Sequence, residues 1–184
     1  MLKTTLTPLA LVVASLSAPA SANLIISEYV EGGSNNKAVE LYNNSGAELS
    51  LDGYNISLYS NGNGDLTSPN NTLDLSGTLP ANGTYVIVNA GSVDELKAKA
   101  DTEATVTYFN GDDALVLTKG GVIVDSFGQL GVDPGKEWSA GGVTTKDKSL
   151  RRKLDITAGR VDATSAFDTK SPHHLAQGRT ARHS

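Results

Sequence analysis

The chain contains no cysteine, and its three histidines all fall within the last twelve residues, at His173, His174 and His183. No disulfide can therefore support the fold, and its stability has to come from packing. A catalytic centre that depends on an imidazole or a thiolate cannot lie between Asn23 and Ser171. These absences favour a binding function over a catalytic one.

Long hydrophobic runs are also missing. The apolar run Leu9–Leu16 is less than half of the roughly 20 residues that a helix needs to cross a bilayer. It follows the positive charge of Lys3 and precedes the small residues Ala20-Ser21-Ala22, which is the pattern of a secretory signal. We predict a signal peptide over residues 1–22, cleavage near Ala22, and a mature protein that is extracellular or periplasmic and has no membrane span.

Charge is distributed unevenly along the chain. Residues 23–145 carry 16 acidic and 5 basic residues, a balance of −11, whereas residues 146–184 carry 4 acidic and 9 basic residues, a balance of +5. A uniformly acidic protein would argue against a nucleic-acid partner. A basic segment following an acidic body leaves such a partner open.

Short apolar runs separated by Gly, Asn, Asp and Ser recur through residues 24–126 and predict strands. The predicted strands are Leu24–Val30, Ala38–Asn43, Tyr54–Ser60, Thr72–Leu75, Thr84–Asn89, Thr105–Phe109, Ala114–Thr118 and Val122–Phe127. The run Thr84–Asn89 is apolar on both faces, which favours a central strand. The last two runs are joined by Lys119-Gly120-Gly121, which is typical of a tight hairpin.

One short helix is predicted near residues 93–100, because Ser92-Val93-Asp94-Glu95 has the form of a capping box. A single short helix among eight or nine strands predicts an all-β sandwich or barrel. The only tryptophan, Trp138, is expected to pack in the core.

Three groups of polar residues suggest other chemistry, and in each the structural reading is favoured. Asn61–Asp65 resembles half of a calcium loop, but Thr72 stands where the bidentate carboxylate should be. In Asn110–Asp113, a turn in which Asp113 caps backbone amides explains the residues better than a cation site. The first two predicted strands carry three glutamates on or beside them, namely Glu28, Glu31 and Glu40. Two of these carboxylates could act as an acid–base pair in hydrolysis, but glutamates on a solvated strand face are commoner. We predict no catalytic residue, no metal and no cofactor.

The best partner signal is a basic run near the end of the chain. We predict that it binds nucleic acid through Lys146, Lys148, Arg151, Arg152 and Lys153. On an extended strand Arg151 and Lys153 share one face, whereas Lys148 and Arg152 share the other face with Leu150 and Leu154. Arg152 would then be buried unless it pairs or lies at an edge. The alternative role for the lysines is to protect an edge strand from pairing with another chain.

Four motifs resemble the lamin-tail domain, in the form found at the N-terminus of secreted bacterial nucleases of the endonuclease/exonuclease/phosphatase class. The motifs are NLIISEYVEGGSNNKAVELYN, FNGDDALVL, VDSFGQLGVDPGKEW and KSLRRK, in that order, and the resemblance extends over about residues 23–170. It implies an immunoglobulin-like β-sandwich over 23–170, followed by a disordered tail over 171–184. It supplies no catalytic residues, since the nuclease chemistry belongs to a separate downstream domain.

The resemblance implies a secreted, non-catalytic accessory or targeting module of an extracellular nuclease, with nucleic acid or a nuclease catalytic domain as partner. Two alternatives remain. The first is a structural or cell-surface adhesion module that binds protein or glycan. The second is that the chain is a truncated fragment of a full-length nuclease.

Overall fold

The computed structural model describes residues 24–170 and 176–177. The predicted signal peptide and the three histidines lie outside these residues, as does nearly all of the predicted tail. No helix among the described residues is long and apolar enough to span a membrane.

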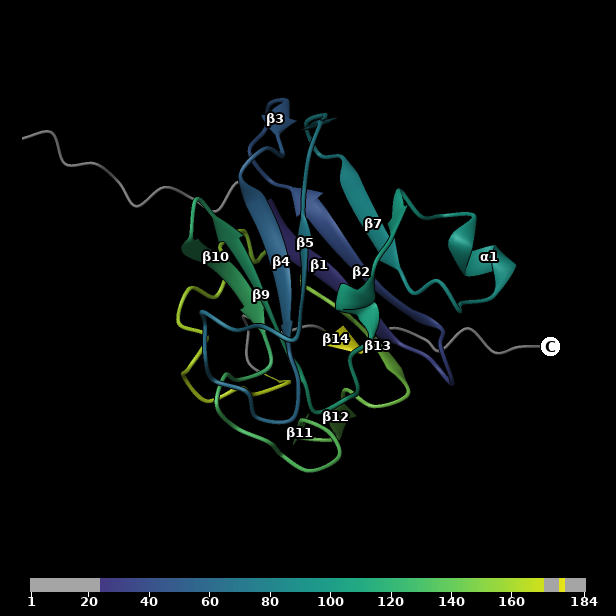
Figure 1. The fold of residues 1–184 in the computed structure, drawn as a ribbon, viewed down its shortest axis with the longest axis vertical. Helices are drawn as coiled ribbons and strands as arrows, with labels where there is room; N and C mark the ends of the chain where they lie inside the picture. The colour runs from purple at the N-terminus through teal and green to yellow at the C-terminus, as the bar shows by residue number, and fades with distance from the viewer. Residues whose placement is uncertain (1–23, 171–175, 178–184) are drawn as a thin grey trace, which may run out of the picture.

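Two mainly antiparallel sheets pack face to face, so the prediction of an all-β sandwich is confirmed (Figure 1). The larger sheet has the strand order β14 (Ala176–Gln177), β13 (Lys148–Arg151), β1 (Leu24–Glu31), β2 (Lys37–Asn43), β7 (Thr84–Val88) and β8 (Thr102–Glu103), of which β8 alone runs parallel to its neighbour. The smaller sheet has the order β10 (Val122–Phe127), β9 (Ala114–Lys119), β4 (Tyr54–Tyr59) and β5 (Asn71–Asp74). Two small ribbons pair β3 (Leu49–Ser50) with β6 (Thr78–Leu79), and β11 (Ser139–Ala140) with β12 (Val143–Thr144).

The core fills the space between the two sheets, and its side chains follow the alternation of the strands. In β2, Val39 and Leu41 are fully buried while Glu40 and Tyr42 are half-buried on the other face, as the sequence pattern predicts. At the centre of the core the ring of Tyr29 stacks on two phenylalanine rings; they are Phe109, with ring centroids 4.6 Å apart, and Phe127, with centroids 4.1 Å apart. Trp138 is also buried, as predicted.

The β9–β10 hairpin forms at the predicted place. Gly120 and Gly121 have φ angles of +55° and +80°. Two consecutive residues with positive φ make a turn whose twist matches that of the flanking strands, and glycine adopts this conformation without strain.

Two predicted strands differ from the structure. Thr105–Phe109 is not a strand, because it begins with a 3-10 helix, η1 (Thr105–Thr107). A 3-10 turn places residues three apart on the same side, and this lets Val106 and Phe109 both bury their side chains between the sheets. The run Thr84–Asn89 is not buried on both sides either, since Tyr85 and Val86 are half-buried. Strand β7 pairs with β2 along one edge, but along its other edge it has only the two-residue β8.

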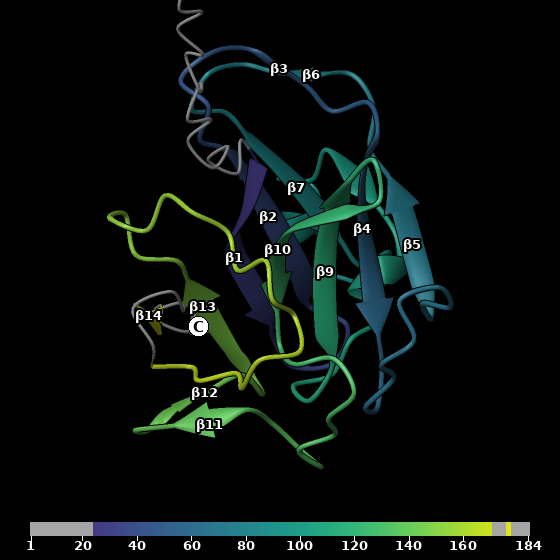
Figure 2. The same ribbon diagram turned by 90° about the vertical axis from the view of Figure 1, so that its left-hand side faces the viewer.

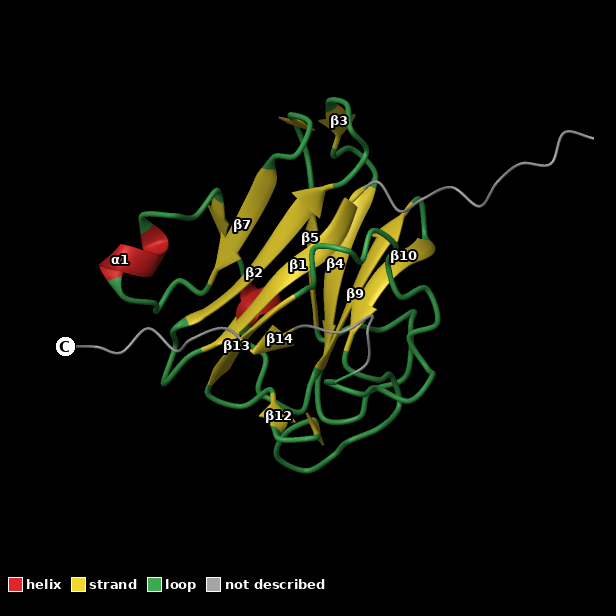
Figure 3. Cartoon of the chain, turned by 180° about the vertical axis from the view of Figure 1, so that it is seen from behind, coloured by secondary structure: helices red, strands yellow, loops and turns green. Residues whose placement is uncertain are grey.

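The short helix α1 (Asp94–Lys97) lies beyond the β7–β8 edge, within the predicted region (Figure 3). The predicted capping box is wrong, because the N-cap residue is Val93 and makes no side-chain cap bond. The hydroxyl of Ser92 instead donates to the backbone carbonyl of Asn35, 2.8 Å away. This bond ties the helix to the β1–β2 loop.

Residues 152–170 form no regular strand and run beside the sandwich (Figure 2). Part of this segment covers the outer face of the smaller sheet, where Ala163 packs with Tyr59, Val116 and Leu130. Its beginning forms a wall of the groove described next.

Candidate functional site

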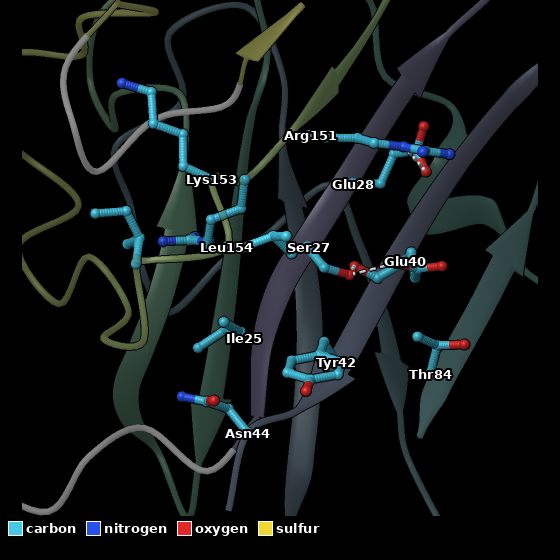
Figure 4. Close-up of a pocket in the computed structure, with 12 residues that line it drawn as sticks. Ile25, Ser27, Glu28, Glu40, Tyr42, Asn44, Thr84, Arg151, Lys153 and Leu154 are labelled. Carbon is cyan, nitrogen blue, oxygen red and sulfur yellow. Dashed lines mark hydrogen bonds and ion pairs between the residues drawn. The ribbon is translucent and has the colours of Figure 1, made fainter. Parts of the chain in front are cut away.

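A groove of about 430 Å³ lies on the outer face of the larger sheet (Figure 4). Its floor consists of side chains from β1, β2 and β7, and its wall is formed by the end of β13 and by residues 152–156. Three members of the predicted basic run line it, namely Arg151, Arg152 and Lys153.

A β-bulge in β1 shapes the floor of this groove. The pairing of β1 with β2 shifts between Ile26 and Glu28, so Ser27 is an extra residue in β1. In a regular strand two consecutive side chains point to opposite faces, whereas a bulge allows both to lie on one face. Ser27 and Glu28 accordingly both line the groove.

Two rows of side chains cross the floor. One row is mainly apolar and aromatic, because Ile25 of β1 lies opposite Tyr42 of β2, which lies opposite Thr84 of β7. The other row is charged and consists of Arg151 of β13, Glu28 of β1 and Glu40 of β2.

The charged row places two carboxylates on directly opposite positions, which is unfavourable without compensation. Arg151 compensates one of them, since its Nε lies 3.0 Å from Oε2 of Glu28. The hydrogen bond to Glu28, the charge of Glu28 and then that of Glu40 raise the pKa of Arg151. Ser27 donates to Oε1 of Glu40 at 2.7 Å. The side chain of Arg151 is 69% exposed, so it stays accessible to a ligand.

Arg152 points in the opposite direction, into the protein. Its guanidinium lies 2.6 Å from Oδ2 of Asp125, and the two side chains are only 6% and 0% exposed. It also donates from Nε to the carbonyl oxygen of Ile26 and from Nη1 to that of Ala158. The sequence pattern predicts that a buried Arg152 needs a partner, and Asp125 is that partner. Through its bond to Ile26, Arg152 also anchors the groove wall to β1.

Asp125 is surrounded by donors. Besides Arg152, it accepts hydrogen bonds from the backbone amides of Ile26, Ser126 and Arg160 at 2.7–2.9 Å. Burial raises the pKa of this carboxyl, while Arg152 and the three amides lower it in part. The carboxyl thus joins β1, β10 and the segment after β13.

The close packing of this segment against β10 gives a testable prediction. A Cβ atom on Gly159 would lie 2.0 Å from the carbonyl oxygen of Val124, so Gly159→Ala has to displace the segment. We expect a loss of about 1–3 kcal/mol in the free energy of unfolding, measured by urea denaturation. Gly33→Ala is the matched control, because a Cβ there meets nothing within 4 Å. Equal stability of the two variants would contradict this packing.

The other predicted basic residues lie along β13 and its flanks. Lys146 is exposed in the turn before β13, Lys148 is half-buried at its first position, and Lys153 is exposed just beyond its end. With Arg151, four of the five predicted cations therefore face solvent at least in part. Strand β13 is not a free edge over its whole length, because β14 pairs with Leu150 and Arg151.

The other polar groups serve structural roles. Asp113 caps backbone amides as predicted, accepting from Asn110 at 2.7 Å and from Asn61 at 2.9 Å. In the predicted calcium-like loop, Asp65 accepts from both the amide and the hydroxyl of Thr67. Among the described residues, no three His, Cys, Asp or Glu side chains are grouped so that they could hold a metal ion.

The predicted glutamate cluster is divided. Glu28 and Glu40 lie opposite one another in the groove, whereas Glu31 is buried elsewhere and pairs with Lys37 at 3.4 Å. Burial raises the pKa of Glu31, and Lys37 partly offsets this effect. The Lys37 ammonium also donates to the carbonyl oxygen of Phe109 at 2.5 Å and approaches Asn110 Oδ1 at 3.3 Å.

Sequence reasoning missed Ser27, Tyr42 and Thr84 as groove residues. Strand alternation places Tyr42 on the outer face, but only the order of the strands brings it between Ile25 and Thr84. No sequence signal marks the bulge that exposes Ser27.

Comparison with known proteins gives one family and a fold relative. The family model described as Lamin Tail Domain matches residues 17–131, a range that includes β1 to β10 but not β13. Lamin tail domains have an immunoglobulin-like fold, in agreement with the sandwich. The crystal structure of a DUF4876 family protein from Bacteroides thetaiotaomicron VPI-5482 is similar with a TM-score of 0.52 at 11% identity, over 87% of this chain and 69% of that one. This likeness concerns the fold alone. No curated protein matches the chain.

Proposed function

Because the chain belongs to the lamin tail domain family, we propose that it is a non-catalytic module that binds nucleic acid and serves as an accessory domain of an extracellular nuclease. The observation that carries the proposal is a set of four cations, each at least partly exposed, along β13 and its flanks. They are Lys146, Lys148, Arg151 and Lys153. Neither comparison indicates a catalytic domain, which is consistent with a non-enzymatic role.

The arrangement suits a polyanion for a physical reason. Four cations within eight consecutive residues can each neutralise a phosphate and release its condensed counterion. Arg151 is oriented by Glu28, which engages Nε and leaves both Nη groups of the guanidinium for a ligand. Export after cleavage near Ala22 belongs to the same proposal, since an extracellular nuclease module has to leave the cytoplasm.

The salt dependence of binding tests the proposal. For four phosphate contacts on duplex DNA, affinity should fall by about two orders of magnitude between 50 and 200 mM salt. The variant Arg151→Ala/Lys153→Ala should bind more weakly and show about half of this logarithmic salt slope. Filter binding of the purified chain to labelled duplex DNA at the two salt concentrations measures both quantities.

The variants of this test are chosen from the burial of each cation. Arg152 is left intact, because removing it would destabilise the fold rather than report on binding. The charge-matched control is Lys136→Ala/Lys170→Ala, in which both lysines are exposed and lie outside the groove. No binding at low salt, or an unchanged slope in the Arg151/Lys153 variant, would refute nucleic-acid binding. Salt-independent binding to a neutral polysaccharide would support the adhesion alternative instead.

A further inference from the structure

The groove contains one feature that phosphate binding leaves unexplained, namely the carboxylate of Glu40 at its floor. Glu28 forms an ion pair with Arg151, whereas Glu40 has no ion pair among the described residues and feels Arg151 only as a more distant charge. The side chain of Glu40 accepts a hydrogen bond from the hydroxyl of Ser27, on Oε1. Its Oε2 has no hydrogen-bond partner among the described residues. A carboxylate in this position repels phosphates, and it needs a ligand that presents N–H or O–H donors.

The bases of an unpaired strand differ in the donors that they present on their Watson–Crick edges. Guanine presents two adjacent donors, the ring N1–H and the exocyclic amino group, which match the two oxygens of a carboxylate. Adenine and cytosine present one amino group beside an acceptor nitrogen. Thymine and uracil present one N–H between two carbonyl oxygens, which a carboxylate repels. Glu40 therefore favours guanine among the bases.

The groove also supplies a stacking surface and room for a base. The ring of Tyr42 lies between Ile25 and Thr84 on the same floor as Glu40, and its hydroxyl is fixed by donation to Asn82 Oδ1 at 2.9 Å (Figure 4). A fixed ring is a suitable platform, because stacking of a base on an aromatic side chain contributes about 1–3 kcal/mol in single-strand binders. The volume of about 430 Å³ accommodates a nucleoside, which is smaller than the drug-sized ligands that such pockets enclose.

We propose that the groove binds one unpaired guanine of a single-stranded nucleic acid, with the base against Tyr42, its Watson–Crick edge on Glu40, and the flanking phosphates on Arg151 and Lys153. This inference rests on the proposed function and adds a base preference to it. Double-stranded DNA then binds only through its phosphates, because pairing occupies the guanine edge.

The test compares fluorescein-labelled oligonucleotides that differ in one base. The probes are a twelve-residue oligo-dT and the same strand with one central dG, dA, dC or deoxyinosine, titrated against the full chain by fluorescence anisotropy at 50 mM salt. The dG strand should bind about tenfold more tightly than oligo-dT, in the range of a good bidentate base contact. Deoxyinosine lacks the exocyclic amino group of guanine, so the deoxyinosine strand should lose most of this gain in affinity. This comparison uses the wild-type protein alone.

Two isosteric variants locate the preference. Glu40→Gln keeps the size of the side chain but replaces one acceptor oxygen by a donor, and it should abolish the preference for dG while leaving the salt dependence in place. Glu48→Gln is the control, because Glu48 is exposed outside the groove. Equal affinity for all five strands, or a dG preference that survives in Glu40→Gln, overturns the guanine site. If binding is salt-dependent but shows no base preference, the proposed function stands without the site. Absence of binding to every strand refutes both.

Discussion

Replacing Arg152 with alanine is expected to lower the free energy of unfolding by about 3–5 kcal/mol, because it leaves a buried carboxylate without its cation. Asp125 is fully buried and lies 2.6 Å from the Arg152 guanidinium. The same change removes the bonds from the guanidinium to Ile26 and Ala158. Urea denaturation followed by tryptophan fluorescence measures the loss, since Trp138 is the only tryptophan.

Its neighbour provides the control. Arg151 also forms an ion pair, but its side chain is 69% exposed, so Arg151→Ala should cost about 0–1 kcal/mol. Similar losses in the two variants would contradict the distinction between a buried and an exposed pair.

The loss of unfolding free energy in Arg152→Ala should also depend on pH. Burial raises the pKa of Asp125 in the folded protein, and loss of Arg152 removes an interaction that lowers it. A carboxyl whose folded pKa lies above its unfolded value stabilises the fold below the unfolded pKa, and this contribution is lost as pH rises through the folded pKa. The difference between wild type and Arg152→Ala should therefore be largest at neutral pH and shrink in acid. A difference that is constant with pH would show that Asp125 does not titrate in this way.

The second large effect is expected at the centre of the core. Tyr29→Ala should cost about 3–5 kcal/mol, as is usual for truncation of a buried aromatic ring. The ring is 1% exposed and stacks on both Phe109 and Phe127, so its removal leaves a cavity between the sheets.

Tyr29→Phe separates the ring from the hydroxyl. The hydroxyl donates to the carbonyl oxygen of Asn110 at 3.1 Å, and its loss alone should cost about 1 kcal/mol. Both values come from chemical denaturation at neutral pH. If Tyr29→Ala lost no more than Tyr29→Phe, the stacking would not be a major source of stability.

Much of the sandwich follows from residue patterns that act over short distances. Alternation in β2 and the glycine pair after Lys119 each determine local structure, and both predictions are confirmed. The η1 turn was missed because Val106 and Phe109 are apolar whether they lie in a strand or in a 3-10 turn. The capping box failed because Ser92 has a tertiary partner, Asn35, that no local pattern reveals.

The candidate site was predictable in composition but not in arrangement. Strand alternation predicts that Arg152 needs a partner if it is buried. That partner, Asp125, lies 27 positions away (152 − 125), and no sequence pattern marks it as the partner of a buried arginine. The same alternation placed Arg151 and Lys153 together, and both line the groove. The floor that they border depends on the order β13-β1-β2-β7, which places the β1–β2 hairpin between two strands that are far from it in the chain.

The pairing of β1 with β13 has a consequence for how the chain folds. Glu28 and Arg151 are 123 positions apart (151 − 28), yet they are direct neighbours in the sheet. At ribosomal rates of about 5–20 residues per second, β1 waits roughly 6–25 s for its second partner to be made. During that interval one side of β1 presents unpaired backbone groups, which are a template for wrong pairing. The nascent larger sheet stays incomplete until β13 has been synthesised.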